Sequence, residues 1–144
     1  MIFTIPQSIG VSVSYLLYYK IVIFLSLTAL ILATITDIKR REVYDLLNHG
    51  LFATAVLLRL IFTVVTLDHV FVYDGLLGFV LAFGLGLLMY YTGQWGGGDA
   101  KMLFALGVLF GIPVTSDLLV IFDSLLPSFI VNMLIAGSLY GFIW

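Results

Sequence analysis

Cysteine is absent from this sequence, and charged residues occupy only 10% of its 144 positions. Without cysteine the chain has no disulfide, no thiolate nucleophile and no cysteine-ligated metal, and its two histidines, His49 and His69, do not form a metal-ligand cluster. Its six basic residues are outnumbered by eight acidic ones, which leaves no basic surface for a nucleic acid. Because the first basic residue is Lys20, the N-terminus lacks the positive region of a signal peptide, and the first apolar run is expected to remain as a helix.

Apolar residues dominate the rest of the chain. They make up 62% of it, and its mean hydropathy is +1.21, whereas soluble domains are roughly 45–50% apolar. In water such a chain would expose too much apolar surface. The composition therefore predicts an all-α fold, a polytopic transmembrane bundle of about 4–6 helices whose surroundings are the lipid bilayer.

Polar segments divide the apolar residues into runs near the length of about 20 residues that a membrane crossing needs. Crossings are expected at residues 15–36, 47–67, 70–91, 100–112 and from a start between 118 and 125 to the end of the chain, the fourth being short. Residues 1–144 are interpreted as a single transmembrane domain. The last apolar run stops at Trp144 without a charged flank, which suggests a C-terminal truncation or a helix that ends at the interface.

Basic residues indicate how these helices are oriented. Lys39, Arg40, Arg41 and Lys101 all fall in the first and third connections, which helix alternation places on the same side. Cytoplasmic connections carry an excess of Lys and Arg. That side is therefore expected to be cytoplasmic, and the N-terminus is expected to lie outside.

Several residues within the apolar runs are best explained by structure. Arg59 would be expensive inside a membrane unless paired, and Asp74 on the next helix is the expected partner. Trp95 is interpreted as an interface anchor. Close helix packing is the expected role of three small residues in the third crossing, Gly78, Gly84 and Gly86.

Two carboxylates lie where a helix meets the same interface. Asp37 is at the C-terminal end of the first expected helix, and Asp99 comes just before the fourth. Gly96, Gly97 and Gly98 directly precede Asp99. Because glycine adopts positive φ and allows close approach of a ligand, we expect a non-helical, bare backbone there. Such a backbone suits a protease that holds an extended peptide beside its acids.

Each acid also has a plain structural explanation. Asp is a favoured helix N-cap, so Asp99 could serve only to begin the fourth helix, with Lys101 as an interface anchor. Asp37 could be a solvated acid paired with one of the basic residues that follow it.

Together, the two segments resemble the type IV prepilin peptidase family of membrane aspartyl proteases. In that family the first catalytic Asp follows an early helix and precedes a basic stretch, as Asp37 does. The second lies in a G-x-G-D-x-K sequence, which Gly96, Gly98, Asp99 and Lys101 match. The resemblance covers about residues 34–103. The Arg-Glu-Val-x-Asp pattern at 41–45 is similar to the archaeal branch, which processes archaellins and archaeal pilins.

The resemblance implies an aspartic endopeptidase that removes the short basic leader of prepilin or preflagellin precursors at the cytoplasmic face of the cell membrane, without metal or cofactor. Asp37 and Asp99 would be catalytic, one activating a water and the other the scissile carbonyl. Helix dipoles favour a charged Asp99 and a neutral Asp37, whereas the basic residues after Asp37 oppose the second assignment. The residues expected to bind substrate or support the site are Gly96, Gly97, Gly98, Lys101, Glu42 and Asp45. No methyltransferase activity is expected, because the cysteine-rich segment of bacterial members is missing.

Two alternatives stay open from the sequence. Presenilin-like proteases also use G-x-G-D and pair it with a Tyr-Asp motif, which occurs here at Tyr44-Asp45 and Tyr73-Asp74, although their Pro-Ala-Leu motif is absent. A non-enzymatic membrane assembly or transporter subunit would explain the hydrophobicity equally well. It would not explain the two acids in their shared setting.

Overall fold

The computed structural model describes the backbone of residues 7–115 and 117–143, and side chains from residue 13 onwards. The described chain is helical, with short connections. Its helices are α1 (Gln7–Arg40), α2 (Asp45–Thr66), α3 (Val70–Tyr91), α4 (Gly97–Phe110), α5 (Leu118–Asp123) and α6 (Leu125–Ile143). Pro127 falls in the first turn of α6, where its missing N–H has no helical partner to lose.

Four of these helices are long and apolar enough to cross a membrane. They are Val13–Arg40 within α1, Asp45–Thr66, Val70–Tyr91 and Leu125–Ile143. This confirms the predicted all-α membrane bundle. The fourth expected crossing begins earlier than expected, because α4 starts at Gly97 and not at 100. It is short, as expected: its 14 residues span only about 21 Å, less than the ~30 Å hydrocarbon core.

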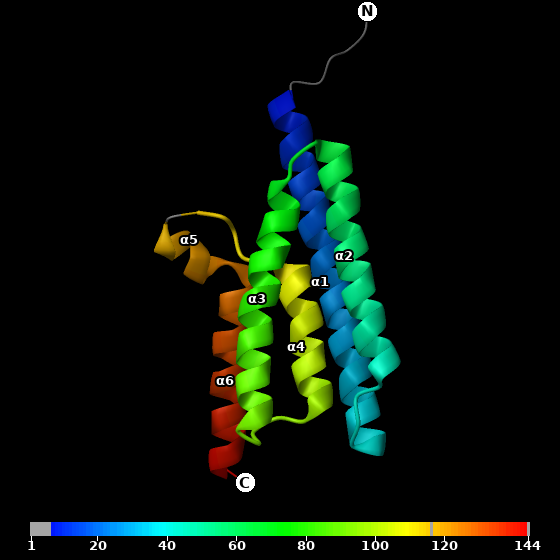
Figure 1. Cartoon of the computed structure of the whole chain (residues 1–144), viewed down its shortest axis with the longest axis vertical. Helices are drawn as coiled ribbons and strands as arrows, with labels where there is room; N and C mark the ends of the chain where they lie inside the picture. The colour runs from blue at the N-terminus through cyan, green and yellow to red at the C-terminus, as the bar shows by residue number, and fades with distance from the viewer. Residues whose placement is uncertain (1–6, 116, 144) are drawn as a thin grey trace, which may run out of the picture.

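The short helix α4 lies in the middle of the bundle (Figure 1). It packs mainly against α3 and α2, with smaller contacts to α1 and α6. Most of its residues are buried, among them Leu106 and Leu109, which are nearly inaccessible. The helix that carries Asp99 is therefore enclosed by other helices, while the long helices present apolar side chains outwards.

Helices α3 and α4 touch through their backbones. A Cβ on Gly78 would lie 2.2 Å from the carbonyl oxygen of Gly107, and one on Gly107 would lie 2.3 Å from the Cβ of Ala82. At Gly86 a Cβ would collide with the ring of Phe104. Gly78 and Gly86 thus permit close packing, as expected, but the expectation for Gly84 is wrong because nothing lies within 4 Å of its Cβ position.

The buried Arg59 binds the end of α4 and does not form the expected ion pair with Asp74. Its guanidinium donates to the carbonyls of Val108, Leu109 and Phe71. The last carbonyls of a helix have no partner within it and carry partial negative charge. The positive charge of Arg59 is therefore stabilised by main-chain carbonyl dipoles.

Asp74 holds the chain just beyond α4. Its carboxylate accepts the N–H of Val114 at 2.9 Å, and its own carbonyl accepts the N–H of Ile112 at 2.9 Å. Gly75 and Gly111 give the Arg59 side chain its space, since a Cβ on either would lie within 2.3 Å of it. Arg59 and Asp74, which look like an ion pair in the sequence, are thus each hydrogen-bonded to main-chain groups.

The connection between α1 and α2 and the turn between α3 and α4 lie at the same end of the bundle, where α6 also ends (Figure 1). Lys101 and Asp45 join them with an ion pair of 2.6 Å. At the opposite end, the Tyr15 hydroxyl donates to the Asp68 carboxylate in the link between α2 and α3, at 2.7 Å. The expected placement of both acidic segments at one end of the bundle is confirmed.

Candidate active site

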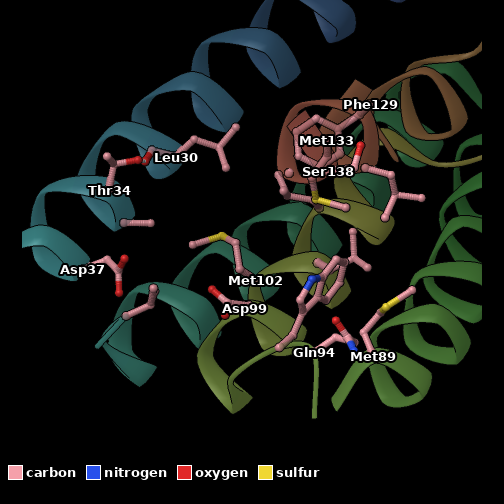
Figure 2. A pocket seen from close by; sticks show the side chains of 17 residues that line it. Leu30, Thr34, Asp37, Met89, Gln94, Asp99, Met102, Phe129, Met133 and Ser138 are labelled. Carbon is pink, nitrogen blue, oxygen red and sulfur yellow. Dashed lines mark hydrogen bonds between the residues drawn. The ribbon is translucent and has the colours of Figure 1, made fainter. Parts of the chain in front are cut away.

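A cavity of about 760 Å³ lies between α1, α4 and α6, and both Asp37 and Asp99 line it (Figure 2). It follows α1 from Asp37 back to Leu30 and α4 from Asp99 forward to Leu106, about 10 Å along each helix. The remaining wall comes from α6, from the end of α3 and the turn after it, and from the α1–α2 connection. It comprises Phe129, Met133, Leu134, Gly137, Ser138, Met89, Gln94, Trp95 and Val43. Two acids thus stand at one end of a mainly apolar hollow.

Asp99 occupies the third position of α4 and caps the helix that carries it. Its Oδ2 accepts the backbone N–H of Gly96 at 3.1 Å, the return contact by which an acid at this position satisfies a free N–H. This bond fixes the side chain while the other carboxylate oxygen remains available. The carboxylate is exposed, and it projects into the cavity (Figure 2).

Asp37 lies in the last turn of α1, three residues before the helix ends at Arg40. Its carbonyl accepts the N–H of Arg41 at 2.7 Å. Its carboxylate is exposed and has no hydrogen bond or ion pair with any of the described residues. Contact with one of the basic residues that follow it, the plain structural explanation, is therefore not seen in the described part of the chain.

The two acids face one cavity from different helices, and no hydrogen bond joins them. The side chain of Met102, one turn beyond Asp99, enters the same space (Figure 2). Among the described residues, no group of three or more His, Asp or Glu side chains could hold a metal ion.

Lys101 and Asp45, expected to support the site, lie outside the cavity and pair with each other. Their ion pair of 2.6 Å joins the first turns of α4 and α2, with the two side chains 44% and 62% exposed. Because both side chains are exposed, the pair is expected to contribute little to stability. Glu42 is exposed and has no hydrogen bond or ion pair with other described side chains.

The three glycines do not form the expected non-helical segment. Gly97 and Gly98 are the first two residues of α4, and positive φ among the described glycines occurs only at Gly93 and Gly111. Gly98 has a packing role: a Cβ there would lie 3.2 Å from the Cβ of Val43. The expectation of unusual dihedrals is therefore wrong, because capping by Asp99 and packing on the α1–α2 connection outweigh the low helix propensity of glycine.

Sequence reasoning missed two residues at this site. Trp95, interpreted as an interface anchor, lines the cavity. Asn48 is 2% exposed, and its amide N–H donates to the carbonyl of Gly98 at 3.2 Å. Asn48 shares the buried face of α2 with Leu51, Ala55 and Arg59, so a polar residue at helical spacing within an apolar stripe was the available signal.

Comparison with known proteins agrees with this geometry. The model of the type IV leader peptidase family matches residues 23–143, a span that holds both acids and every helix from the second half of α1 onward. The chain belongs to the type IV leader peptidase family. The predicted resemblance is thereby confirmed, and with it the multi-pass membrane character of the chain.

Curated members of this family include three similar proteins named preflagellin peptidase. The one from Methanococcus maripaludis is 32% identical over 115 residues, which cover 77% of this chain and 50% of the relative. The one from Methanocaldococcus jannaschii is 31% identical over 116 residues, covering 78% and 49%. The one from Methanococcus voltae is 32% identical over 97 residues, covering 65% and 41%.

This chain thus spans about half the length of the curated relatives it matches. No solved structure matches it significantly. The comparisons establish the family, and they support the preflagellin peptidase branch that the pattern at residues 41–45 indicates.

Proposed function

We propose that this protein is a membrane aspartyl endopeptidase that removes the basic leader from preflagellin-like or prepilin-like precursors. The observation that carries the proposal is that Asp37 and Asp99 line the same cavity from two different helices. Membership of the type IV leader peptidase family and similarity to preflagellin peptidases support it.

The chemistry requires one carboxylate as base and one carboxylic acid. The base takes a proton from a water that attacks the scissile carbonyl, and the acid hydrogen-bonds the carbonyl oxygen and later protonates the leaving amine. Asp99 suits the base, because the N-terminus of α4 and the Gly96 N–H favour a negative charge. Asp37 suits the acid, because it lies at the carbonyl end of α1.

The cavity suits a precursor whose leader is followed by an apolar segment. Beyond the acids its walls are mainly apolar side chains of α1, α4 and α6, against which an apolar segment is stabilised by burial. A basic leader would remain outside, near the acids at the end of the bundle. Glu42 is at that end and would add negative charge for it. The Asp45 carboxylate is paired with Lys101, and this pair, with Gly96, Gly97 and Gly98, would maintain the start of α4.

The site is assigned to the cytoplasmic face of the cell membrane. Lys39, Arg40, Arg41 and Lys101 are all at the end of the bundle that holds the acids, and cytoplasmic ends carry such an excess of basic residues. Since the chain has no cysteine, single cysteines at Lys39 and His69 can report this directly. In intact cells an impermeant thiol reagent should label position 69 and spare position 39.

Cleavage of a preflagellin tests the function. The purified protein in lipid vesicles is incubated with a preflagellin carrying its leader, and the products are identified by mass. The expected product is the mature chain cut between leader and apolar segment, with an unmethylated N-terminus. Undigested precursor, under conditions in which a known preflagellin peptidase cuts it, would favour the non-enzymatic membrane subunit instead.

A further inference from the structure

We propose that Asn48 is a positioning residue, which holds Asp99 in place through the backbone of Gly98. This inference rests on the proposed function, since it assigns to Asp99 the catalytic role. Asn48 does not line the cavity and so acts on the acid only through the start of α4.

The surroundings of Asn48 make its amide unusual. It is 2% exposed on the apolar, inward face of α2, and its Nδ2 donates to the carbonyl of Gly98 at 3.2 Å. Its Oδ1 is buried without a hydrogen-bond partner among the described residues. A buried amide oxygen without a hydrogen bond lowers the stability of the folded protein, and an apolar side chain of the same size would avoid that cost. A role other than stability explains its presence.

Contacts with the backbone of Gly98 affect the position of Asp99 most directly. The two residues are adjacent in the first turn of α4, so a shift of the Gly98 carbonyl turns the peptide that carries Asp99. Val43 packs against the Cα of Gly98, whose Cβ position lies 3.2 Å from the Cβ of Val43. The backbone at Gly98 is therefore fixed by a contact with the α1–α2 connection and by the hydrogen bond from Asn48.

The other links between α2 and this turn are weaker constraints. The ion pair between Lys101 and Asp45 is exposed, and an exposed pair of flexible side chains fixes geometry poorly. Arg59 is on the same face of α2 as Asn48, but it binds the opposite end of α4 through Val108 and Leu109. Asn48 alone among the described residues joins α2 to the turn of Asp99 by a hydrogen bond whose donor side chain is buried.

The test compares Asn48→Leu with Asn132→Leu for kcat, KM and thermal unfolding midpoint in lipid vesicles. Leu matches Asn in size and removes the donor. Asn132 is a matched control because its Nδ2 also donates to a main-chain carbonyl, that of Ser128 at 2.8 Å, but within α6 and on an exposed face. Asn48→Leu should lower kcat by about 10- to 100-fold, as displacement of a catalytic group does, with KM within about twofold and an unfolding midpoint no lower than that of the wild type.

Asn132→Leu should retain the wild-type kcat. The hydroxyl of Asn48→Ser is too short to take over the hydrogen bond to Gly98, so this variant should reproduce the loss of kcat. It shows whether the loss in Asn48→Leu comes from the missing hydrogen bond or from the packing of the Leu side chain. The inference is overturned if Asn48→Leu keeps the wild-type kcat. It is also overturned if both Asn48 variants lose kcat together with a lowered unfolding midpoint. Either result would leave the proposed function intact. A wild-type protein that cleaves nothing would overturn the proposed function, and this inference with it.

Discussion

The guanidinium of Arg59 on α2 donates to the main-chain carbonyl of Leu109, in the last turn of α4, at 3.2 Å. Because α4 is too short to reach across the membrane, its last carbonyls need donors within the bundle, in surroundings without water. The Tyr18 hydroxyl supplies one of these donors, to the Leu109 carbonyl at 3.0 Å. Unpaired carbonyls are expensive there. Arg59 satisfies them and places its charge next to the negative end of the helix dipole.

Replacing Arg59 by Met should therefore destabilise the protein by about 1–3 kcal/mol, the range for leaving buried acceptors unsatisfied. Gly75→Ala should also destabilise it, because the new Cβ would lie 2.3 Å from the Arg59 Cδ. In the Arg59→Met background that collision is relieved, so the effect of Gly75→Ala should shrink. Free energies of unfolding in bicelles measure this coupling.

Gly84→Ala is the control for this cycle, since nothing lies within 4 Å of its Cβ position on the same helix. It should have little effect in either background. Strictly additive effects of Arg59→Met and Gly75→Ala would show that the two positions do not share the space seen in the structure.

Asp37→Asn and Asp99→Asn should each abolish cleavage while the protein remains folded in the membrane. Each change removes the titratable group and keeps the size, and one carboxylate cannot serve as both base and acid. The double variant should be no worse than either single one, because residues that act as a unit are not additive. Cleavage of a preflagellin at equal protein levels is the measurement.

Asp123→Asn is the control for the acids, because Asp123 is exposed at the end of α5 and outside the cavity. It should cleave normally. If Asp74→Asn abolished cleavage and Asp37→Asn did not, the acids would be wrongly assigned, and the Tyr-Asp pairing of presenilin-like proteases would be the better explanation.

Gly98→Ala should slow cleavage by about tenfold or more, because its Cβ would press on Val43 at 3.2 Å and displace the turn of Asp99. Gly97→Ala should cleave at nearly the wild-type rate, since its Cβ would lie 3.7 Å from the ring of Tyr90, an ordinary contact. Val43→Gly, which removes the Cβ that the new methyl group would meet, should restore part of the activity of Gly98→Ala. Initial rates at matched protein levels distinguish these variants, and equal rates for Gly97→Ala and Gly98→Ala would contradict the packing role of Gly98.

The hydrogen bond from Tyr15 lowers the pKa of the Asp68 carboxyl below its ordinary value of 3.8, assisted by the N–H of Val70. A carboxyl whose pKa is lower in the folded protein contributes stability above its unfolded pKa and loses it as the pH falls through the folded pKa. Tyr15→Phe should therefore cost up to about 1 kcal/mol at neutral pH, since the pair is partly exposed. The difference from wild type should fade once the pH falls below about 3.8.

Unfolding midpoints measured from pH 7 down to about pH 2 test this difference. Tyr19→Phe is the control, because the Tyr19 hydroxyl has no hydrogen bond to another described residue. A Tyr15→Phe effect that stays constant below pH 3.8 would show that it does not arise from the hydrogen bond to the Asp68 carboxylate.

Hydropathy predicted the long helices closely, because the bilayer leaves few alternatives to a helix. The third crossing, expected at 70–91, is α3 to the residue, since Asp68 and His69 precede a continuous apolar run and Thr92 and Gly93 follow it. The start of α4 was misplaced because glycine propensity was weighed without the return contact of Asp99 to Gly96. That contact is visible only once the helix exists.

Polar partners were harder to predict than helices. The sequence offers Arg59 an obvious counter-charge in Asp74, but it does not reveal that a helix ends inside the bundle and presents carbonyls to Arg59. The shared cavity of Asp37 and Asp99 was predictable from their two motifs and helix alternation. The contact of Asn48 with Gly98 was not, because it depends on how deeply α4 sits against α2.

The different contacts of the two acids bear on how a complex with an uncut precursor can be captured. The Asp99 carboxylate caps α4 through Gly96, so a substitution there acts on the cap of the helix as well as on the chemistry. The Asp37 carboxylate bonds to none of the described residues, so Asp37→Asn removes an acid and disturbs nothing else that the structure describes. Asp37→Asn is therefore the better inactive trap for crystallography or cross-linking, because a precursor bound to it would meet an undistorted α4.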